Sequence, residues 1–241
     1  MTADGDLSVG VGAAALRVGG FLPFTMVDYP GALAAVIFCQ GCPLRCLYCH
    51  NRGLTPACGT AQIEWKDIRA HLERRAGLLD AVVFSGGEPL MQAALCGAMK
   101  QAKTLGYKIG LHTSGVAPGR LRQVVPLLDW VGFDVKAPFE KYQEITGVHG
   151  AGEKARQSLA MLTAANIQTE VRTTLWPGHV DCDEVSDISR QILEMGVEDF
   201  AVQEARDPVT RAPKKSAFFT DLALQNEIAE KFENYVLRRA A

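Results

Sequence analysis

The segment CPLRCLYCHN, residues 42–51, places three cysteines, Cys42, Cys46 and Cys49, within eight positions of one another. Cys39 stands three residues before the first of them. Thiolates at this spacing are ligands for a soft metal centre, either zinc or an iron–sulfur cluster. The chain has seven cysteines, and an odd number with four of them clustered argues against a disulfide framework and favours a metal site.

The number of thiolates separates the possible centres. A structural zinc site takes four ligands, often from two cysteine pairs, and the second pair is missing here unless Cys39 joins. Cys39 ends the apolar segment LAAVIFC and alternates with Ala35 and Ile37, which predicts a thiol packed in the core. Three thiolates on a four-iron cluster would leave one iron open for chemistry. The scattered cysteines are predicted to be structural: Cys58, Cys96 and Cys182.

Apolar segments alternate with helical patterns along the chain. Strands this apolar are covered on both faces, which predicts an α/β fold with a parallel sheet, either an open six-stranded partial barrel or a doubly wound sheet. We expect a loose arm over residues 1–20 and a single domain over 21–241, because no linker divides the rest. The expected strands are 33–39, 80–86, 107–115, 129–137, 167–175 and 198–205, and the expected helices are 63–75, 90–105, 117–125, 154–165, 183–195 and 221–238.

Polar residues gather where the expected strands end. Since parallel strands present their carboxyl ends at one edge, these residues are expected to form one site. The glycines after the second strand allow close approach to a ligand or make a plain tight turn. The two histidines of the region, His50 and His112, are expected to support the site through hydrogen bonds. The strand-end residues are Ser85, Gly86, Gly87 and Glu88, then His112, Thr113 and Ser114, Asp134 to Lys136, Arg172 to Thr174, and Gln203 with Glu204.

Composition excludes several classes of protein. The net charge is −2, so no nucleic acid partner is expected. No apolar run approaches the length of about 18 residues that a membrane span needs. The first residues are acidic and lack the basic start of a signal peptide, so a cytoplasmic location is expected.

The cysteine spacing resembles the signature of the radical S-adenosylmethionine (SAM) enzymes. Tyr48 fills the aromatic position before the last cysteine, and SGGEP at 85–89 is similar to the family's GGE motif. The resemblance implies a partial (β/α)6 barrel in which Cys42, Cys46 and Cys49 hold a [4Fe-4S] cluster and SAM chelates the fourth iron. It also implies that Tyr48 lies near the adenine and that Gly86, Gly87 and Glu88 receive the SAM amino group.

Further motifs resemble one branch of that family, the activases of glycyl radical enzymes. TMVDYPG (25–31), YCHN (48–51), LHTSG (111–115), FDVKAP (133–138) and EVRTTLWPG (170–178) agree most closely with a bacterial group named anaerobic ribonucleoside-triphosphate reductase activating protein. In formate-lyase activases an Asp-Leu-Lys triplet contacts SAM. A His also follows the Arg of the next strand in those activases, where this chain has Thr173, and this departure weakens an assignment to formate-lyase activation. The resemblance implies that the SAM site includes Ser114, Asp134, Val135, Lys136, Arg172 and Thr173.

The partners follow from the same resemblance. The protein substrate would be a glycyl radical enzyme, specifically an anaerobic ribonucleotide reductase, and the electron donor would be flavodoxin or ferredoxin. One alternative is a small-molecule radical SAM enzyme similar to 7-carboxy-7-deazaguanine synthase. Another is a non-catalytic iron–sulfur or zinc protein that uses Cys39 as a fourth ligand. The basic connection ARDPVTRAPKKSAFF, residues 205–219, either lines the mouth of the site or is a flexible link.

Overall fold

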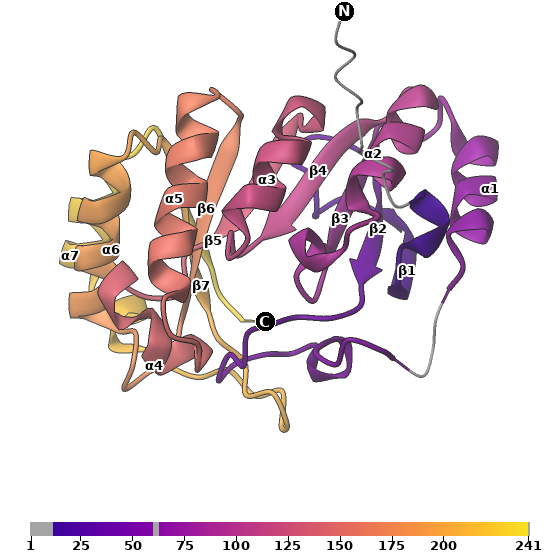
Figure 1. Cartoon of the computed structure of the whole chain (residues 1–241). Coiled ribbons are helices and arrows are strands. Elements are labelled where there is room, and N and C mark those ends of the chain that lie inside the picture. Colours follow the sequence, from indigo (N-terminus) through magenta and orange to yellow (C-terminus); the bar gives the residue numbers. More distant parts are fainter. Residues whose placement is uncertain (1–11, 60–62, 241) are drawn as a thin grey trace, which may run out of the picture.

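A single curved sheet organises the chain in the computed structural model, which describes residues 12–59 and 63–240 (Figure 1). Within these residues the sheet has eight strands, and their spatial order is their order along the chain. β1 runs antiparallel to β2, whereas every later pair of neighbours is parallel. The strands are β1 (Val18–Thr25), β2 (Ala34–Cys39), β3 (Ala81–Gly86), β4 (Lys108–Thr113), β5 (Trp130–Asp134), β6 (Thr169–Leu175), β7 (Asp199–Glu204) and β8 (Asn234–Arg238).

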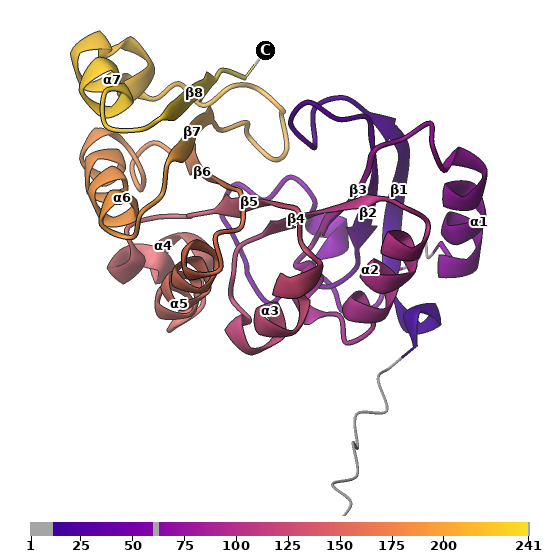
Figure 2. The same ribbon diagram turned by 90° about the horizontal axis from the view of Figure 1, so that it is seen from above.

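The helices lie along one face of the sheet and leave the concave face to the loops (Figure 2). They are α1 (Trp65–Arg75), α2 (Leu95–Thr104), α3 (Pro118–Val124), α4 (Tyr142–Thr146), α5 (Ala151–Ala164), α6 (Cys182–Glu194) and α7 (Leu222–Ala229). Short 3-10 turns are found at Ala13–Ala15, Arg52–Leu54, Pro89–Met91, Val125–Leu127, Phe139–Lys141 and Ala217–Thr220.

The strand order decides between the two folds that the sequence left open. A doubly wound sheet reverses its strand order and carries helices on both faces, whereas here the order never reverses. The six predicted parallel strands are confirmed as β2 to β7. They form an open partial barrel that β1 and β8 extend at its two edges.

Two expected boundaries differ most from the structure. The expected arm, residues 1–20, reaches into the fold, because Ala13, Leu16 and Val18 are buried and β1 begins at Val18; residues 1–11 lie outside the described part. The expected helix 221–238 ends at Ala229, and the chain then forms β8. The sequence NYVLR has the β-branched and aromatic residues that favour strands, and pairing with β7 overrides the helical spacing seen further upstream.

The apolar core determines where a cavity can lie. The larger cluster fills the space between the sheet and its helices. A smaller cluster covers the concave face, where Tyr29 from the β1–β2 connection packs on Trp130 with ring centroids 5.4 Å apart. Three of its members, Ala34, Ala81 and Trp130, are the first residues of their strands. The amino ends of the strands are therefore filled, and the polar residues at the carboxyl ends remain open to a ligand.

Candidate functional site

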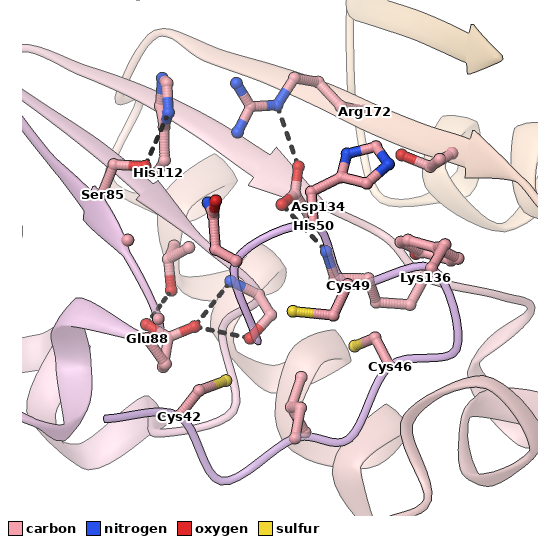
Figure 3. A pocket seen from close by; sticks show the side chains of 18 of the residues that line it. Cys42, Cys46, Cys49, His50, Ser85, Glu88, His112, Asp134, Lys136 and Arg172 are labelled. Atoms are coloured by element: carbon pink, nitrogen blue, oxygen red, sulfur yellow. Dashed lines mark hydrogen bonds and ion pairs between the residues drawn. The ribbon is translucent and has the colours of Figure 1, made fainter. Parts of the chain in front are cut away.

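One cavity of about 340 Å³ lies at the carboxyl ends of β2 to β7 (Figure 3). It brings together eleven of the thirteen residues proposed from the sequence as metal or cofactor contacts: Cys42, Cys46, Tyr48, Cys49, Gly86, Gly87, Glu88, Ser114, Asp134, Lys136 and Arg172. Its other lining residues are Leu44, His50, Asn51, Thr55, Ser85, His112, Thr113, Thr174, Gln203 and Glu204. The polar strand ends thus form one rim, as expected from a parallel sheet.

Backbone hydrogen bonds hold the segment that follows β2, residues 40–59, over the cavity. We call this segment the cysteine loop. Gly41 N donates to Leu54 O at 2.7 Å and Cys42 N to Thr55 O at 3.0 Å. Further along, Arg45 N donates to the Thr146 carbonyl of α4 at 2.8 Å. The loop is therefore fixed at both ends and in its middle, which positions its thiols without a helix or strand of its own.

The three thiols face the same space from different sides. Cys46 and Cys49 lie close together, and Cys42 approaches from the side of Glu88 (Figure 3). Among the described residues, no three His, Cys, Asp or Glu side chains converge closely enough to hold one metal ion. Soft donors spread around a common cavity fit a polynuclear cluster, because each thiolate of such a cluster binds a different iron. The residues present thus fit a [4Fe-4S] group.

Cys39 does not belong to this site. Its side chain is 0% exposed in the core, and it does not line the cavity. Burial raises the pKa of its thiol well above the usual range, and Glu88 raises it further. The prediction that Cys39 packs in the core is confirmed, so the structure does not support it as a fourth ligand. Cys58 is exposed and also lies outside the lining of the cavity.

Glu88 is 1% exposed, and its carboxylate accepts four hydrogen bonds. Oε1 accepts from Leu90 N at 3.1 Å and from Thr113 Oγ1 at 2.7 Å. Oε2 accepts from Ser114 N at 2.9 Å and from Ser114 Oγ at 2.6 Å. Burial raises the pKa of Glu88, while the bonds from Ser114 and Thr113 lower it. These bonds occupy the four acceptor positions of a carboxylate, so a ligand ammonium can reach Glu88 only by displacing a donor.

Asp134, Lys136 and Arg172 form an ion-paired group on the rim. Asp134 Oδ1 accepts from Arg172 Nε at 3.0 Å, directly across from β6, and Oδ2 accepts from Lys136 Nζ at 3.0 Å. Burial by itself raises the pKa of Asp134, but the two cations outweigh it and hold that pKa below its usual range. Lys136 Nζ also lies 5.7 Å from the centre of the Tyr48 ring. Two cations around one carboxylate leave a positive charge that suits an anionic ligand group.

Two of the proposed contacts lie elsewhere. Val135 is 1% exposed and Thr173 is 0% exposed, and neither lines the cavity. Successive side chains of an extended segment point to opposite faces, so Asp134, Lys136, Arg172 and Thr174 turn inward. Of the residues expected to contact the cofactor, Val135 and Thr173 therefore lie outside the cavity lining, and Thr174 takes the inward place on β6.

His112 and Ser85 were not proposed as cofactor contacts, yet both line the cavity. The Nδ1 atom of His112 lies 3.3 Å from Ser85 Oγ, and Nε2 lies 3.0 Å from the Asp28 carbonyl oxygen. Burial, with a smaller effect of Arg172, lowers the pKa of His112 to about 3. The ring is therefore neutral, with Nε2 donating to Asp28 and Nδ1 accepting from Ser85. The signal in the sequence that His112 lines the cavity was its position beside Thr113 and Ser114 at the end of a strand.

A glutamine in place of His112 is expected to change the dependence of stability on pH. In the unfolded chain His112 binds a proton below a pKa near 6.5, whereas the folded protein binds it only below about 3. Because the unfolded state holds the extra proton between these values, the imidazole makes the free energy of unfolding fall as pH falls, by at most about 1.4 kcal/mol per unit. His112→Gln keeps a donor for Asp28 and removes this slope. Urea unfolding of both proteins from pH 7 to pH 3 measures the difference, and parallel curves would contradict the buried neutral ring.

No helix in the described part of the chain has the length and hydrophobicity to cross a membrane.

Comparison with known proteins matches residues 36–189 to the model of the radical SAM superfamily. A protein of Methanocaldococcus jannaschii, provisionally named glycyl-radical enzyme activating enzyme, is 28% identical over 92% of this chain and 95% of its own length. The pyruvate formate-lyase 1-activating enzyme of Escherichia coli K12 is 28% identical over 70% of this chain and 71% of its own.

The fold also resembles that of SuiB from Streptococcus suis, solved with SAM bound. The TM-score is 0.64 at 12% identity, over 83% of this chain and 48% of SuiB, so the chain spans about half of that protein and the likeness concerns the fold alone. Enzymes of the matched family typically use a [4Fe-4S] cluster together with SAM. The matched segment contains the three cavity thiols, the Gly-Gly-Glu turn and the Asp134 group, and it covers more than half of the chain. The chain therefore belongs to the radical SAM superfamily.

Proposed function

We propose that this protein is an activating enzyme that removes a hydrogen atom from a glycine Cα of a partner glycyl radical enzyme. Cys42, Cys46 and Cys49 hold a [4Fe-4S] cluster, and SAM binds beside it. The observation that carries the proposal is that three thiols and a buried polar rim line the same cavity. The names of the two curated relatives, both activating enzymes, support this branch of the family.

When bound, the cluster would supply the electron for the reductive cleavage of SAM, the chemistry on which hydrogen abstraction depends. The residues of the chain bind and orient. Lys136 and Arg172, held by Asp134, present positive charge to the carboxylate of SAM. The ring of Tyr48, which is 7% exposed, forms a wall for the adenine. Glu88 fixes Ser114 at the end of β4, so that the rim is rigid before a ligand arrives.

The partner whose glycine is oxidised follows from the motifs rather than from the cavity. LHTSG and FDVKAP both lie on the rim, and they support an anaerobic ribonucleotide reductase as the substrate. A flavodoxin or a ferredoxin in the cytoplasm would supply the electron.

Anaerobic incubation of the reconstituted protein with SAM, a reductant and an anaerobic ribonucleotide reductase is expected to give a glycyl radical. Electron paramagnetic resonance detects this radical as a doublet, and mass spectrometry detects one 5′-deoxyadenosine for each radical. A reductase whose glycine is replaced by alanine is the matched control, because it lacks the radical site. SAM cleavage that needs no protein partner but depends on a small molecule would contradict the proposal and favour the deazaguanine synthase alternative.

A further inference from the structure

The connection from β7 to α7 is joined to the cysteine loop rather than hanging free. His50 Nε2 lies 2.9 Å from the Arg206 carbonyl oxygen. Lys214 Nζ lies 5.2 Å from the centre of the Trp176 ring, and that ring packs 6.2 Å from the ring of Tyr48. Both segments lie along the lower edge of the molecule in Figure 1. Loop and connection therefore form one continuous surface around the proposed cluster.

Internal contacts keep the connection in one shape. The Asp207 carboxylate accepts hydrogen bonds from Val209 N and Thr210 N, both at 2.9 Å. It also pairs with Lys214 at 3.2 Å. Lys214 N in turn donates to the Ala205 carbonyl at 2.8 Å, which closes the base of the connection. A surface that is already ordered loses less conformational entropy when a partner binds.

The charge of this surface opposes the charge of the whole chain. Residues 40–59 contain two arginines and no acidic residue, and residues 205–216 contain four basic residues and one acidic residue, Asp207. The neighbouring α4 adds Glu144, whereas the whole chain has a net charge of −2. The basic side chains, which we call the basic rim, are Arg45, Arg52, Arg206, Arg211, Lys214 and Lys215. Positive charge is thus concentrated beside the cavity proposed for the cluster.

We propose that the basic rim is the docking surface of an acidic one-electron carrier protein. This inference rests on the proposed function, because only a bound cluster needs the electron. The carrier loses one electron and the cluster gains it, with no proton or group transferred. Redox proteins meet through small interfaces, so complementary charge rather than buried area would select the partner.

Long-range electrostatic attraction sets the size of the effect that a charge reversal should have on carrier binding. Complementary charge raises association rates by 10- to 1000-fold at low ionic strength, and salt screens it beyond about 8 Å at physiological ionic strength. The double variant Arg52→Glu with Lys215→Glu reverses two exposed charges of the basic rim. It is expected to bind an acidic flavodoxin about tenfold or more weakly at low salt. The difference should shrink at physiological salt. Neither residue lines the cavity, so SAM binding should be unaffected.

The measurement is the binding isotherm of oxidised flavodoxin with the reconstituted protein, by titration calorimetry at two ionic strengths. The matched control reverses Lys100 and Arg122, which are exposed on α2 and α3 and cover the opposite face of the sheet. Equal losses of flavodoxin affinity in both double variants would overturn the proposal, because the change in net charge alone would then explain the losses. Unchanged flavodoxin binding would overturn it as well.

Photoreduced deazaflavin, which is uncharged, separates this proposal from the proposed function. With it, the rim variant should cleave SAM at the wild-type rate and form the same amount of glycyl radical. A lower radical yield in that assay, with flavodoxin binding intact, would assign the surface to the glycine-bearing partner and overturn the inference. A wild-type protein that cleaves no SAM would contradict the proposed function, whereas the isotherm would still decide whether the rim binds an acidic carrier.

Discussion

Replacing Cys46 with alanine is expected to abolish SAM cleavage and to lower the iron bound after reconstitution. Cys46 is one of three thiols around the cavity, and in the described part of the chain no fourth cysteine lines the cavity to take its place. Residues that only support metal ligands are worth 10- to 100-fold in affinity or activity, so loss of a ligand should cost more than about 100-fold. Iron content, the absorbance of the cluster and the rate of 5′-deoxyadenosine formation measure the effect.

Two other cysteines provide the matched controls. Cys58→Ala removes an exposed thiol, and Cys39→Ala removes a thiol buried in the core, at the cost of a single sulfur atom. Both variants are expected to keep the cluster and the SAM-cleaving activity. A Cys39 variant that loses its iron while Cys46→Ala keeps it would restore the fourth-ligand alternative, with a closed cluster or a zinc site. Circular dichroism of each variant shows whether a lost cluster reflects an unfolded protein.

Alanine in place of Gly86 is expected to cause a large loss of stability for the addition of a single methyl group. Gly86 has φ +113°, a conformation that costs other residues about 1–3 kcal/mol. The added Cβ would also lie 2.6 Å from the Cys39 carbonyl oxygen of β2, and backbone cannot move aside as a side chain can. Overpacking of this kind costs about 1–3 kcal/mol more. We expect a loss of about 3 kcal/mol, or roughly 6–12 °C in Tm for a chain of this size.

Gly119→Ala is the control for this variant. Nothing lies within 4 Å of the Cβ that it would add, its φ is not positive, and it belongs to α3. Alanine in a helix is favoured over glycine by about 1 kcal/mol, so the free energy of unfolding should be unchanged or slightly higher. Urea denaturation of the cluster-free proteins gives both values. If both glycines tolerate alanine equally, the turn after β3 does not depend on close backbone contact.

The sequence predicted the six parallel strands β2 to β7 well because each is a short apolar segment followed by polar residues. The ends of the chain were predicted less well, for physical reasons. NYVLR has too few residues to show a period, and only its pairing with β7 makes it a strand. The burial of Ala13 and Leu16 likewise depends on the main core, which no local pattern of small apolar residues reveals.

The sequence alone was enough to predict that the three thiols and the Gly-Gly-Glu turn belong to the site. It also predicted that the polar strand ends share one edge of the sheet. These features follow from local chemistry and from the parallel order of strands, which the chain itself encodes. Only the tertiary structure decided which side chains of the rim face inward, and it places Thr174 rather than Thr173 in the cavity lining. It also joined the basic connection 205–216 to the cysteine loop. Such contacts join residues far apart in the chain, and their geometry exists only once the sheet has curved and the loops have packed upon it.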